Sequence, residues 1–313
     1  MSAPAPVAYV QNAARERGAP VSLSVLIPFF KDDPSALLAE LEAMAPEGVE
    51  ICLLDDGTGD SALTRRLAEQ VTAMTCPARL ITLVRNAGRA SGRNILAGAA
   101  RGGHLLFVDS DMLPDDPGYL LRWRELASRD NPAVAFGGFS LKRAPDSAPF
   151  ALHRAIAAHG ECLDAAQRAR DPAKHVFTSN LLVRRDVLDA HAFDDSFSGW
   201  GWEDVEWAMR VARHHHIVHI DNTASHLGLD TPEALVAKYE QSPANFARMI
   251  ARHPEVVSRY PSYRVARMIR ALPLRSVFRR ILRAAVLASS LPGRVRARLL
   301  RLYRAALYAE VVR

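Results

Sequence analysis

The sequence predicts an α/β fold with a Rossmann-like, mostly parallel central sheet, followed by a helical extension at the carboxyl end. Between residues 22 and 115, short apolar runs alternate with segments of helical periodicity, and this alternation produces βαβ units and a parallel sheet. Beyond residue 260, arginine recurs among alanine and leucine at near-helical spacing. Apolar residues make up 49% of the 313 residues and charged residues 24%, a composition that allows a sizeable core.

The individual elements follow from these runs. We expect strands at residues 22–28, 49–55, 79–84 and 104–109, separated by helices at 35–44, 61–73 and 90–101. After residue 116 the pattern predicts helices at 119–127, 150–170, 203–214 and 232–252, and strands at 133–139, 179–183 and 217–220. The expected organisation is a flexible Ala/Pro-rich arm over 1–20, a main domain over 21–235 with halves at 21–115 and 116–235, and a basic helical extension over 236–313 broken at Pro273 and Pro292.

The net charge of +6 conceals an asymmetry. Residues 264–313 carry thirteen arginines and one glutamate without lysine or aspartate, a charge of +12, so the remaining residues sum to −6. The helices predicted for this segment are amphipathic. They could lie on an anionic membrane surface, or equally pack on the body with solvated arginines. No nucleic-acid-binding module accompanies the arginines, so a nucleic acid partner is not expected.

The compartment is predicted from what the sequence lacks. Residues 1–20 contain no apolar block, and no later run has the length of a membrane span. The three cysteines, Cys52, Cys76 and Cys162, have neither paired nor metal-type spacing. We therefore expect a cytoplasmic protein that the basic extension could hold peripherally on the inner face of the membrane.

Two acidic pairs follow apolar strands. Asp55-Asp56 precedes Gly57, and Asp109-Ser110-Asp111 follows the fourth strand. In parallel sheets, ligands bind outside the carboxyl ends of the strands. A strand-end aspartate can accept hydrogen bonds from a nucleoside, and two nearby carboxylates can hold Mn²⁺ or Mg²⁺ against a diphosphate. An Asp-Gly turn would explain the first pair alone, but both pairs predict a nucleotide site.

A third block, Gly199-Trp200-Gly201-Trp202-Glu203-Asp204, opens a predicted helix. Glycines around an aromatic residue allow a mobile loop whose indole can stack on a sugar. Glu203 and Asp204 lie in the first helical turn, where the helix dipole keeps a carboxylate ionised and able to act as a general base. The structural alternative is a capped helix with buried tryptophans.

Three further candidates are weaker. The guanidinium of Arg93 suits a phosphate, although a surface arginine is nearly as good an interpretation. Asn180 could bind sugar hydroxyls of an acceptor, and a hydrogen bond within the sheet explains it equally. The run His214–His216 is not a chelating set, because consecutive helical residues point in different directions.

The order Ile27-Pro28-Phe29, Asp55-Asp56-Gly57, Asn86 through Asn94, Asp109-Ser110-Asp111 and Gly199–Asp204 resembles the family 2 glycosyltransferases of GT-A fold. The last block is also similar to the carboxyl-terminal region of β-1,4-galactosyltransferases and bacterial chondroitin-type polymerases. The resemblance covers residues 22–230. It implies inverting, metal-dependent transfer from a nucleotide sugar, often UDP-linked, to a glycan or lipid-linked glycan hydroxyl.

The resemblance also implies roles by position. The halves 21–115 and 116–235 would bind the donor and the acceptor, respectively. Donor contacts would come from Pro28, Phe29, Asp55, Asp56, Arg93, Asp109, Ser110, Trp200 and Gly201. The metal would lie at Asp109, Asp111 and His226, acceptor contacts would come from Asn180, Trp200 and Glu203, and Asp204 would be the catalytic base with Glu203 beside it.

Two departures from the related enzymes matter. Galactosyltransferases have a second glycine where this chain has Trp202, so the loop should be stiffer. Retaining polypeptide N-acetylgalactosaminyltransferases have asparagine at the position of Asp204, so a carboxylate here favours inversion.

Two other functions compete with this interpretation. A nucleotidyltransferase would need a Gly-rich phosphate loop, which residues 27–34 lack. A non-catalytic sugar- or membrane-binding protein would not need the metal carboxylates or Asp204.

Overall fold

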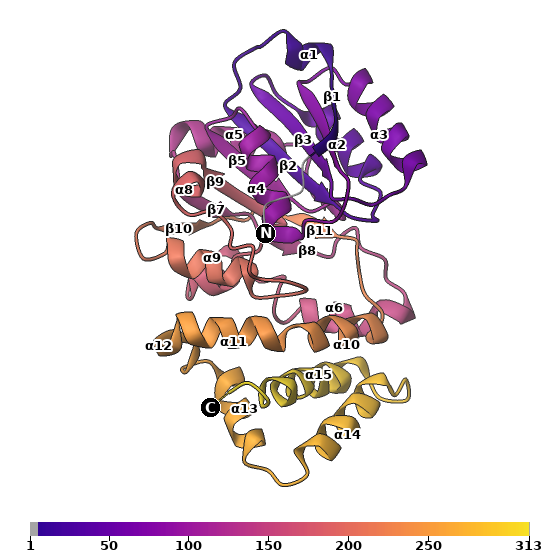
Figure 1. Ribbon diagram of the computed structural model, residues 1–313, viewed down its shortest axis with the longest axis vertical. Coiled ribbons are helices and arrows are strands. Elements are labelled where there is room, and N and C mark those ends of the chain that lie inside the picture. The colour runs from indigo at the N-terminus through magenta and orange to yellow at the C-terminus, as the bar shows by residue number, and fades with distance from the viewer. Residues whose placement is uncertain (1–5, 313) are drawn as a thin grey trace. The chain divides into compact units, whose positions relative to one another are not determined.

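The computed structural model describes residues 6–312, which form two compact units (Figure 1). The first unit contains the chain up to Ala144, Cys162–Ser196 and Trp207–Gly228. The second contains Pro145–Glu161, Phe197–Glu206 and the chain from Leu229 onward. Two internal segments thus group with the carboxyl-terminal helices, which the expected boundary at residue 235 did not anticipate.

An eight-stranded sheet forms the centre of the first unit. Its order is β1-β4-β3-β2-β5-β9-β7-β10. Strands β2 to β5 are parallel, whereas β1 and β9 run antiparallel to their neighbours. The bounds are β1 Pro6–Gln11, β2 Leu23–Phe29, β3 Val49–Asp55, β4 Ala78–Leu83, β5 His104–Val108, β7 Val134–Phe136, β9 Asn180–Arg184 and β10 Ile217–His219. The predicted α/β class with a mostly parallel sheet is confirmed.

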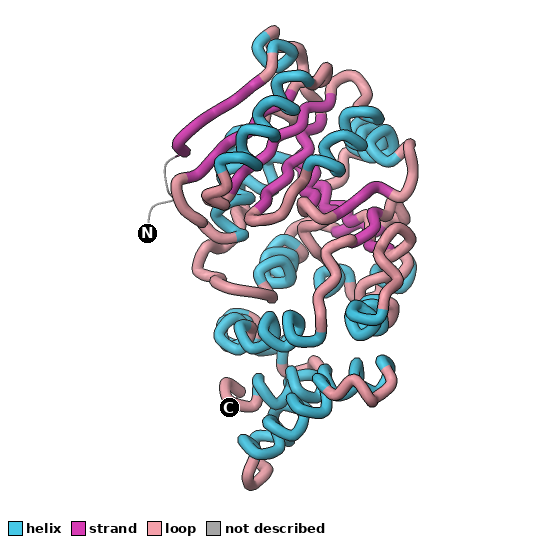
Figure 2. The backbone as a smooth tube through the Cα atoms, turned by 90° about the vertical axis from the view of Figure 1, so that its right-hand side faces the viewer, coloured by secondary structure: helices cyan, strands magenta, loops and turns pink. Residues whose placement is uncertain are grey.

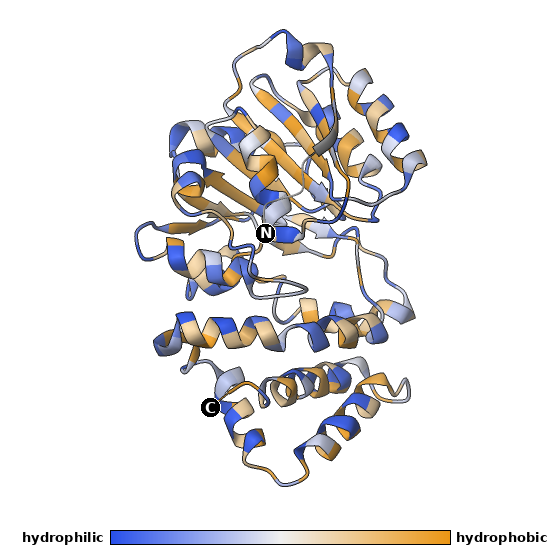
Figure 3. Ribbon diagram, in the orientation of Figure 1, coloured by the Kyte–Doolittle hydropathy of each residue, from blue (hydrophilic) through white to orange (hydrophobic). Residues whose placement is uncertain are grey.

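Helices cover both faces of this sheet. Because both faces are buried, β3 and β5 are mainly apolar, and Figure 3 shows the central strands mainly in the hydrophobic colour. One core packs under α2, α3 and α5, and a second packs under α4, α8 and part of α9. The bounds are α2 Ser35–Met44, α3 Ser61–Ala73, α4 Arg89–Ala99, α5 Tyr119–Arg129, α8 Arg185–Ala190 and α9 Glu203–Val211. Two short helices, α7 Ala165–Arg168 and η2 Pro172–His175, lie between β8 and β9 in the chain.

A second, three-stranded sheet was not predicted as such. It has the order β6-β11-β8, with β6 Met112–Pro114, β11 Ala224–His226 and β8 Phe139–Ser140. The strand expected over 133–139 divides into β7 and β8 at Gly137-Gly138. Gly138 has φ 88°, and a Cβ there would lie 2.4 Å from the Arg168 guanidinium. The bend between the two sheets therefore requires glycine.

The arm expected to be flexible is ordered from residue 6. Strand β1 pairs with β4, and α1 (Ala13–Glu16) follows with Asn12 as its N-cap. The Asn12 amide also donates to the Met74 and Cys76 carbonyls. Arg15 forms a buried ion pair with Glu50, whose side chain is completely buried. These polar contacts fix the segment, although its Ala/Pro-rich composition predicted a flexible arm. Residues 1–5 of the expected arm lie outside the described residues.

The second unit consists of helices and loops (Figure 2). Helix α15 is central to it and contacts α6, α10, α13 and α14. Breaks at Pro273 and Pro292 are confirmed, and the helix expected over 232–252 divides at Ser242-Pro243. The bounds are η1 Ala148–Phe150, α6 Ala151–Ala157, α10 Pro232–Gln241, α11 Pro243–Arg252, α12 Pro254–Val257, α13 Pro261–Arg270, α14 Arg275–Leu287 and α15 Gly293–Tyr308.

Within residues 6–312, every helix is too short or too polar to cross a lipid bilayer.

Candidate functional site

Three parallel strands bring the predicted donor residues to one edge of the main sheet. Phe29 lies opposite Asp55 in the register of β2 and β3, and Leu26 lies opposite Phe107 in that of β2 and β5. The segments that follow β3 and β5, which carry Asp56 and Asp109, therefore leave the sheet at the same edge. This is the edge at which open α/β sheets bind ligands.

Asp55 and Asp56 are both buried and have different partners. The Asp55 carboxylate accepts from the Thr58 amide at 2.8 Å and from the Thr64 hydroxyl at 2.8 Å. This aspartate was expected to face a ligand. Its side chain is instead 1% exposed and fixes the turn after β3. Asp56 accepts from the amides of Ala87, at 2.6 Å, and Gly88, at 3.2 Å. It therefore fastens the loop before α4 to the end of β3.

Burial raises the pKa of Asp56 to about 6, and the neighbouring charge of Asp55 acts in the same direction. The two amide hydrogen bonds oppose this shift but do not cancel it. Gly57 completes the turn in the left-handed region, at φ 74°. A Cβ there would lie 2.3 Å from the Arg85 carbonyl carbon, so the crossing of the two loops excludes any side chain.

The other predicted donor contacts divide by burial. Pro28 is half-buried at the end of β2, whereas Phe29 is 2% exposed and belongs to the hydrophobic core. The aromatic side chain that is exposed at this strand end is Phe30. The Phe29 side chain thus packs in the core, and the expected donor contact of this residue stays a prediction.

Asp111 and His226 form the pair with the geometry of metal ligands. Strand β6 pairs antiparallel with β11 so that Met112 lies opposite His226. This register brings the His226 Nε2 to 3.2 Å from the Asp111 Oδ2. Two ligands of one octahedral ion, each at about 2.1 Å, stand about 3 Å apart. Both side chains are partly exposed, His226 at 22% and Asp111 at 31%, and can therefore accept an ion.

Gly228 provides the room for this carboxylate. A Cβ built on Gly228 would lie 2.0 Å from the Asp111 Oδ2, so any side chain would displace it. A carboxylate and an imidazole are suitable ligands for Mn²⁺, and the glycine keeps the carboxylate beside the imidazole. The residues present therefore fit a divalent cation.

Asp109 and Arg93 form an ion pair at the end of β5. The Arg93 Nη2 lies 3.1 Å from the Asp109 Oδ1, and the arginine side chain is only 3% exposed. Arg93 is therefore not the surface arginine that was the alternative to a phosphate contact. It comes from the buried face of α4 and orients one oxygen of Asp109, which is 34% exposed. Ser110, between the two aspartates, is half-buried.

The loop before α9, in the second unit, has a strained backbone. Gly199 and Gly201 have φ of 74° and 90°, and Trp202 also has a positive φ, 78°. A bulky residue in this region is uncommon and unfavourable. Trp202 thus adopts a conformation that glycine takes easily.

Contacts with α11 and α15 hold this loop. The Trp202 Nε1 donates to the Tyr308 hydroxyl at 2.8 Å, and its ring packs 5.0 Å from that of Phe246. The Asn245 amide donates to the carbonyls of Ser198, at 3.0 Å, and Gly201, at 2.9 Å. The carboxyl-terminal helices therefore position the loop that carries the predicted catalytic residues.

The side chains of the loop differ in burial. Trp200 is half-buried, with its ring 5.0 Å from that of Tyr239. Glu203 is 7% exposed and Asp204 is half-buried, both in the first turn of α9. Glu206, which sequence reasoning missed, is 1% exposed, with the His253 Nε2 at 3.4 Å. The glutamates therefore belong to the interior, and Asp204 and Trp200 are the more accessible candidates.

Asn180 does not match its expected role. Its side chain is completely buried. The amide nitrogen donates to the carbonyls of Gly138 and Asn222, each at 2.9 Å, and the oxygen accepts from the Tyr119 hydroxyl at 2.6 Å. Its hydrogen bonds connect β9 to the bend after β7, to α5 and to the segment before β11, which agrees with the structural interpretation that the sequence left open.

A second acidic centre, around Asp115, was also missed. This carboxylate accepts from the hydroxyls of Thr223 and Ser225, each at 2.6 Å, and so holds β11 beside β6. The position of His226 depends on this pairing. The only signal for Asp115 in the sequence was its place shortly after Asp111. The strand that it holds, β11, was not predicted.

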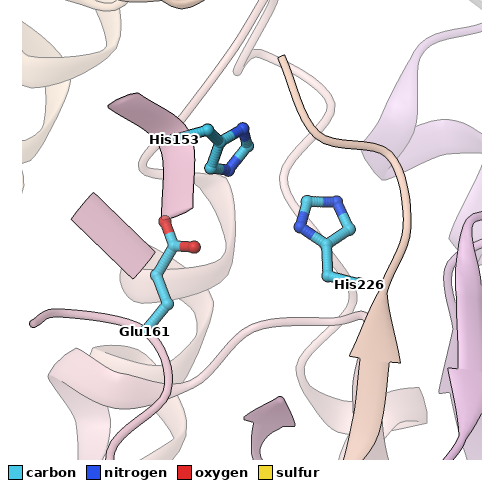
Figure 4. Close-up of side chains that lie close together, drawn as sticks. All are labelled: His153, Glu161 and His226. Atoms are coloured by element: carbon cyan, nitrogen blue, oxygen red, sulfur yellow. The ribbon is translucent and has the colours of Figure 1, made fainter. Parts of the chain in front are cut away.

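Two further potential metal-ligating side chains belong to the second unit. Figure 4 shows His153 on α6 and Glu161 shortly after it, together with His226 of the first unit. The His153 Nδ1 accepts from the Asp230 amide at 2.7 Å. This bond fixes the histidine against the start of α10 and makes it a structural residue of that unit.

Comparisons with known proteins cover the strand-end residues. Residues 24–191 match the family model described as Glycosyl transferase family 2. This match spans Asp56, Asp109 and Asp111, whereas the loop at 199–204 and His226 lie beyond it. No curated protein matches the chain.

The chain is also similar to solved structures. One is a mannosyltransferase, PcManGT from Pyrobaculum calidifontis, in complex with GDP-Man and Mn²⁺. The two sequences are 15% identical, the alignment covers 94% of this chain and 88% of the mannosyltransferase, and the TM-score is 0.57. Another is TarS 1-349 from S. aureus in complex with UDP-GlcNAc, at 14% identity, 91% and 90% coverage and a TM-score of 0.48. The first of these similarities supports the fold.

Proposed function

The chain belongs to glycosyltransferase family 2 and is therefore a glycosyltransferase, and on this premise we propose that it transfers a sugar from a nucleotide sugar to a hydroxyl of a glycan or lipid-linked glycan, with inversion and with a divalent cation. Family membership removes the nucleotidyltransferase and the non-catalytic binding protein as alternatives. The observation that carries the proposal is the Asp111–His226 pair at the ligand-binding edge of the sheet.

The donor side of the proposal rests on the strand ends. Asp56 lies where a nucleoside would bind, near the half-buried Pro28. Asp111 and His226 would hold Mn²⁺ or Mg²⁺, while Arg93 keeps Asp109 oriented beside them. A bound cation would neutralise the negative charge that develops on the departing diphosphate. A UDP-sugar is the expected donor, and the complex of the similar mannosyltransferase with GDP-Man and Mn²⁺ supports a nucleotide sugar and manganese.

The acceptor side of the proposal rests on the loop before α9. Asp204 lies in the first helical turn, where the positive end of the dipole favours its ionised form. It would take the proton of the acceptor hydroxyl as that oxygen bonds to the anomeric carbon and the carbon–diphosphate bond breaks on the opposite side. Trp200 would cover the sugar, and the buried Glu203 would orient the loop.

The proposed setting is polysaccharide biosynthesis at the cytoplasmic face of a membrane. A lipid-linked acceptor would be concentrated there, and the +12 charge of residues 264–313 favours an anionic surface. The enzyme would then be a peripheral protein that meets its acceptor in two dimensions.

Donor binding and chemistry can be tested separately. Thermal unfolding with UDP-, GDP- and dTDP-sugars, each with and without Mn²⁺, should show metal-dependent stabilisation by one nucleotide class. Asp204→Asn should keep this stabilisation and lose sugar transfer by at least about a hundredfold, because asparagine cannot accept the proton.

Asp195→Asn, the same acid-to-amide change at an exposed position outside the proposed site, is the matched control and should retain activity. Normal transfer by the Asp204 variant would remove the base assignment. Absence of any nucleotide-dependent shift in the folded protein would contradict the donor site.

A further inference from the structure

The turn between α13 and α14 carries the densest group of exposed apolar side chains in the described part of the chain. Every residue from Arg270 to Val277 is exposed. Of the ten large apolar side chains that are exposed among the described residues, five lie within residues 268–281, and they are Met268 (71%), Leu272 (44%), Leu274 (75%), Val277 (44%) and Ile281 (61%). Single exposed apolar residues are ordinary, but a contiguous set indicates a contact surface.

The backbone directs this set outward. Leu274 has a left-handed conformation, φ 55°, directly after Pro273, and α14 begins at the next residue. Figure 1 shows α13 and α14 as the two arms of a V whose apex is this turn. The buried residues of α14, Leu282 and Val286, occupy its other face. The helix therefore has one apolar face for its own unit and a second one that no residue among 6–312 covers.

Arginines surround the apolar set. Arg275 and Arg279 share Glu310 as an ion-pair partner. In contrast, four exposed arginines form no ion pair with an acidic residue among residues 6–312, and they are Arg264, Arg267, Arg270 and Arg280. Such guanidinium groups are suited to phosphate oxygens because they offer several donors in one plane.

A hollow beside the apolar set combines both kinds of group. It has a volume of about 510 Å³ and is lined by Ser258, Tyr263, Arg264, Arg267 and Met268. Two guanidinium groups and an exposed thioether thus meet at one depression. A ligand for this surface must offer phosphates and apolar chains at once, as an anionic phospholipid does.

We propose that the apex formed by Leu272, Pro273 and Leu274, with Met268, Val277 and Ile281 beside it, enters the headgroup–acyl boundary of an anionic bilayer, where the surrounding arginines bind lipid phosphates. The proposal rests on the lipid-linked acceptor proposed above and specifies the surface that meets the membrane. The apex lies in the interface and does not cross the bilayer. A nucleic acid would leave the apolar apex without a partner, and a second copy would bring like charges together.

Vesicle co-sedimentation tests the surface without any turnover. Vesicles of phosphatidylcholine containing about one-third phosphatidylglycerol should bind the protein, and vesicles of phosphatidylcholine alone should bind it at least about tenfold less. Leu272→Asn with Leu274→Asn should reduce binding to the anionic vesicles about tenfold or more, because each change removes an apolar side chain from the interface. Val84→Asn, at an apolar position that is 71% exposed in the other unit, is the matched control and should bind normally.

Depth of insertion provides a second readout. Leu274→Trp should show a blue-shifted emission on the anionic vesicles, and the same substitution at Val84 should not. Unchanged binding of the Leu272/Leu274 double variant, or no shift for the tryptophan at 274, would overturn the proposal. Transfer to a soluble acceptor without vesicles should be normal in the double variant, so a failure of the catalytic proposal would be recognised independently.

Discussion

The hydroxyl of Tyr308 is the most informative single group to remove. Its partner, the indole nitrogen of Trp202, belongs to a residue held at φ 78°. A non-glycine residue in this region costs about 1–2 kcal/mol. The contacts that offset this strain are one hydrogen bond, worth about 1 kcal/mol, and two aromatic contacts, with Phe246 and Tyr308, each worth about 0.5–1.5 kcal/mol. These contacts total about 2–4 kcal/mol, so the loss of the hydroxyl removes a large part of the margin over the strain.

Tyr308→Phe removes two hydrogen bonds, those donated by the Trp202 indole and, at 3.1 Å, by the Ser242 hydroxyl, and leaves the ring. The loss of about 1–2 kcal/mol brings the anchored and released states of the loop close to balance. We expect kcat to fall severalfold to about tenfold, with the KM for the donor little changed, because the donor edge belongs to the first unit. The melting temperature should fall by about 2–6 °C.

Tyr303→Phe is the matched control for this experiment. Tyr303 lies on the same helix and donates to Glu240 at 2.6 Å, but it does not contact the loop. Its loss should lower the melting temperature comparably without lowering kcat. If both variants lost stability and both kept kcat, the reasoning that the anchor positions the catalytic loop would be refuted.

Two further predictions concern the first unit. Gly228→Ala places a Cβ 2.0 Å from the Asp111 Oδ2 and should reduce Mn²⁺-dependent activity by about 10–100-fold. Gly98→Ala, where a Cβ meets nothing within 4 Å, is the control and should be neutral. Equal Mn²⁺ titrations of the two variants would contradict the metal assignment. Because the pKa of Asp56 is raised to about 6, its contribution to stability is present at pH 4 and is lost as the pH rises through 6, so the melting temperature of the wild type relative to Asp56→Asn should fall over that interval. A difference that is constant or grows with pH would show that the carboxyl ionises without cost.

The parallel half of the sheet could be predicted because each of its strands is a mainly apolar run, and the carboxylates at the ends of β3 and β5 lie at one edge, as expected. The pattern could not show which of two adjacent carboxylates faces inward. The Asp55 side chain closes its own turn, whereas Asp56 reaches a loop some thirty residues away. Such a difference depends on tertiary contacts that leave no periodic signal.

The short strands were harder to predict. β6 and β11 have three residues each, and the pairing that places His226 beside Asp111 joins positions 115 residues apart. The position of His226 came from a family resemblance and not from its own surroundings in the sequence. Arg15 was missed for a related reason, because its buried partner Glu50 lies within an otherwise apolar strand.

The bond between Trp202 and Tyr308 also has a consequence for synthesis of the protein. The two residues are 106 positions apart, so α15 leaves the ribosome well after the loop that it anchors. The strands that carry the donor residues are complete far earlier, and domains generally fold as their segments emerge. A nascent or truncated chain could therefore gain its nucleotide-binding edge while the loop with Asp204 still lacks its anchor. Under the proposed roles, such a chain would bind donor before it could use it, and completion of α15 would allow sugar transfer.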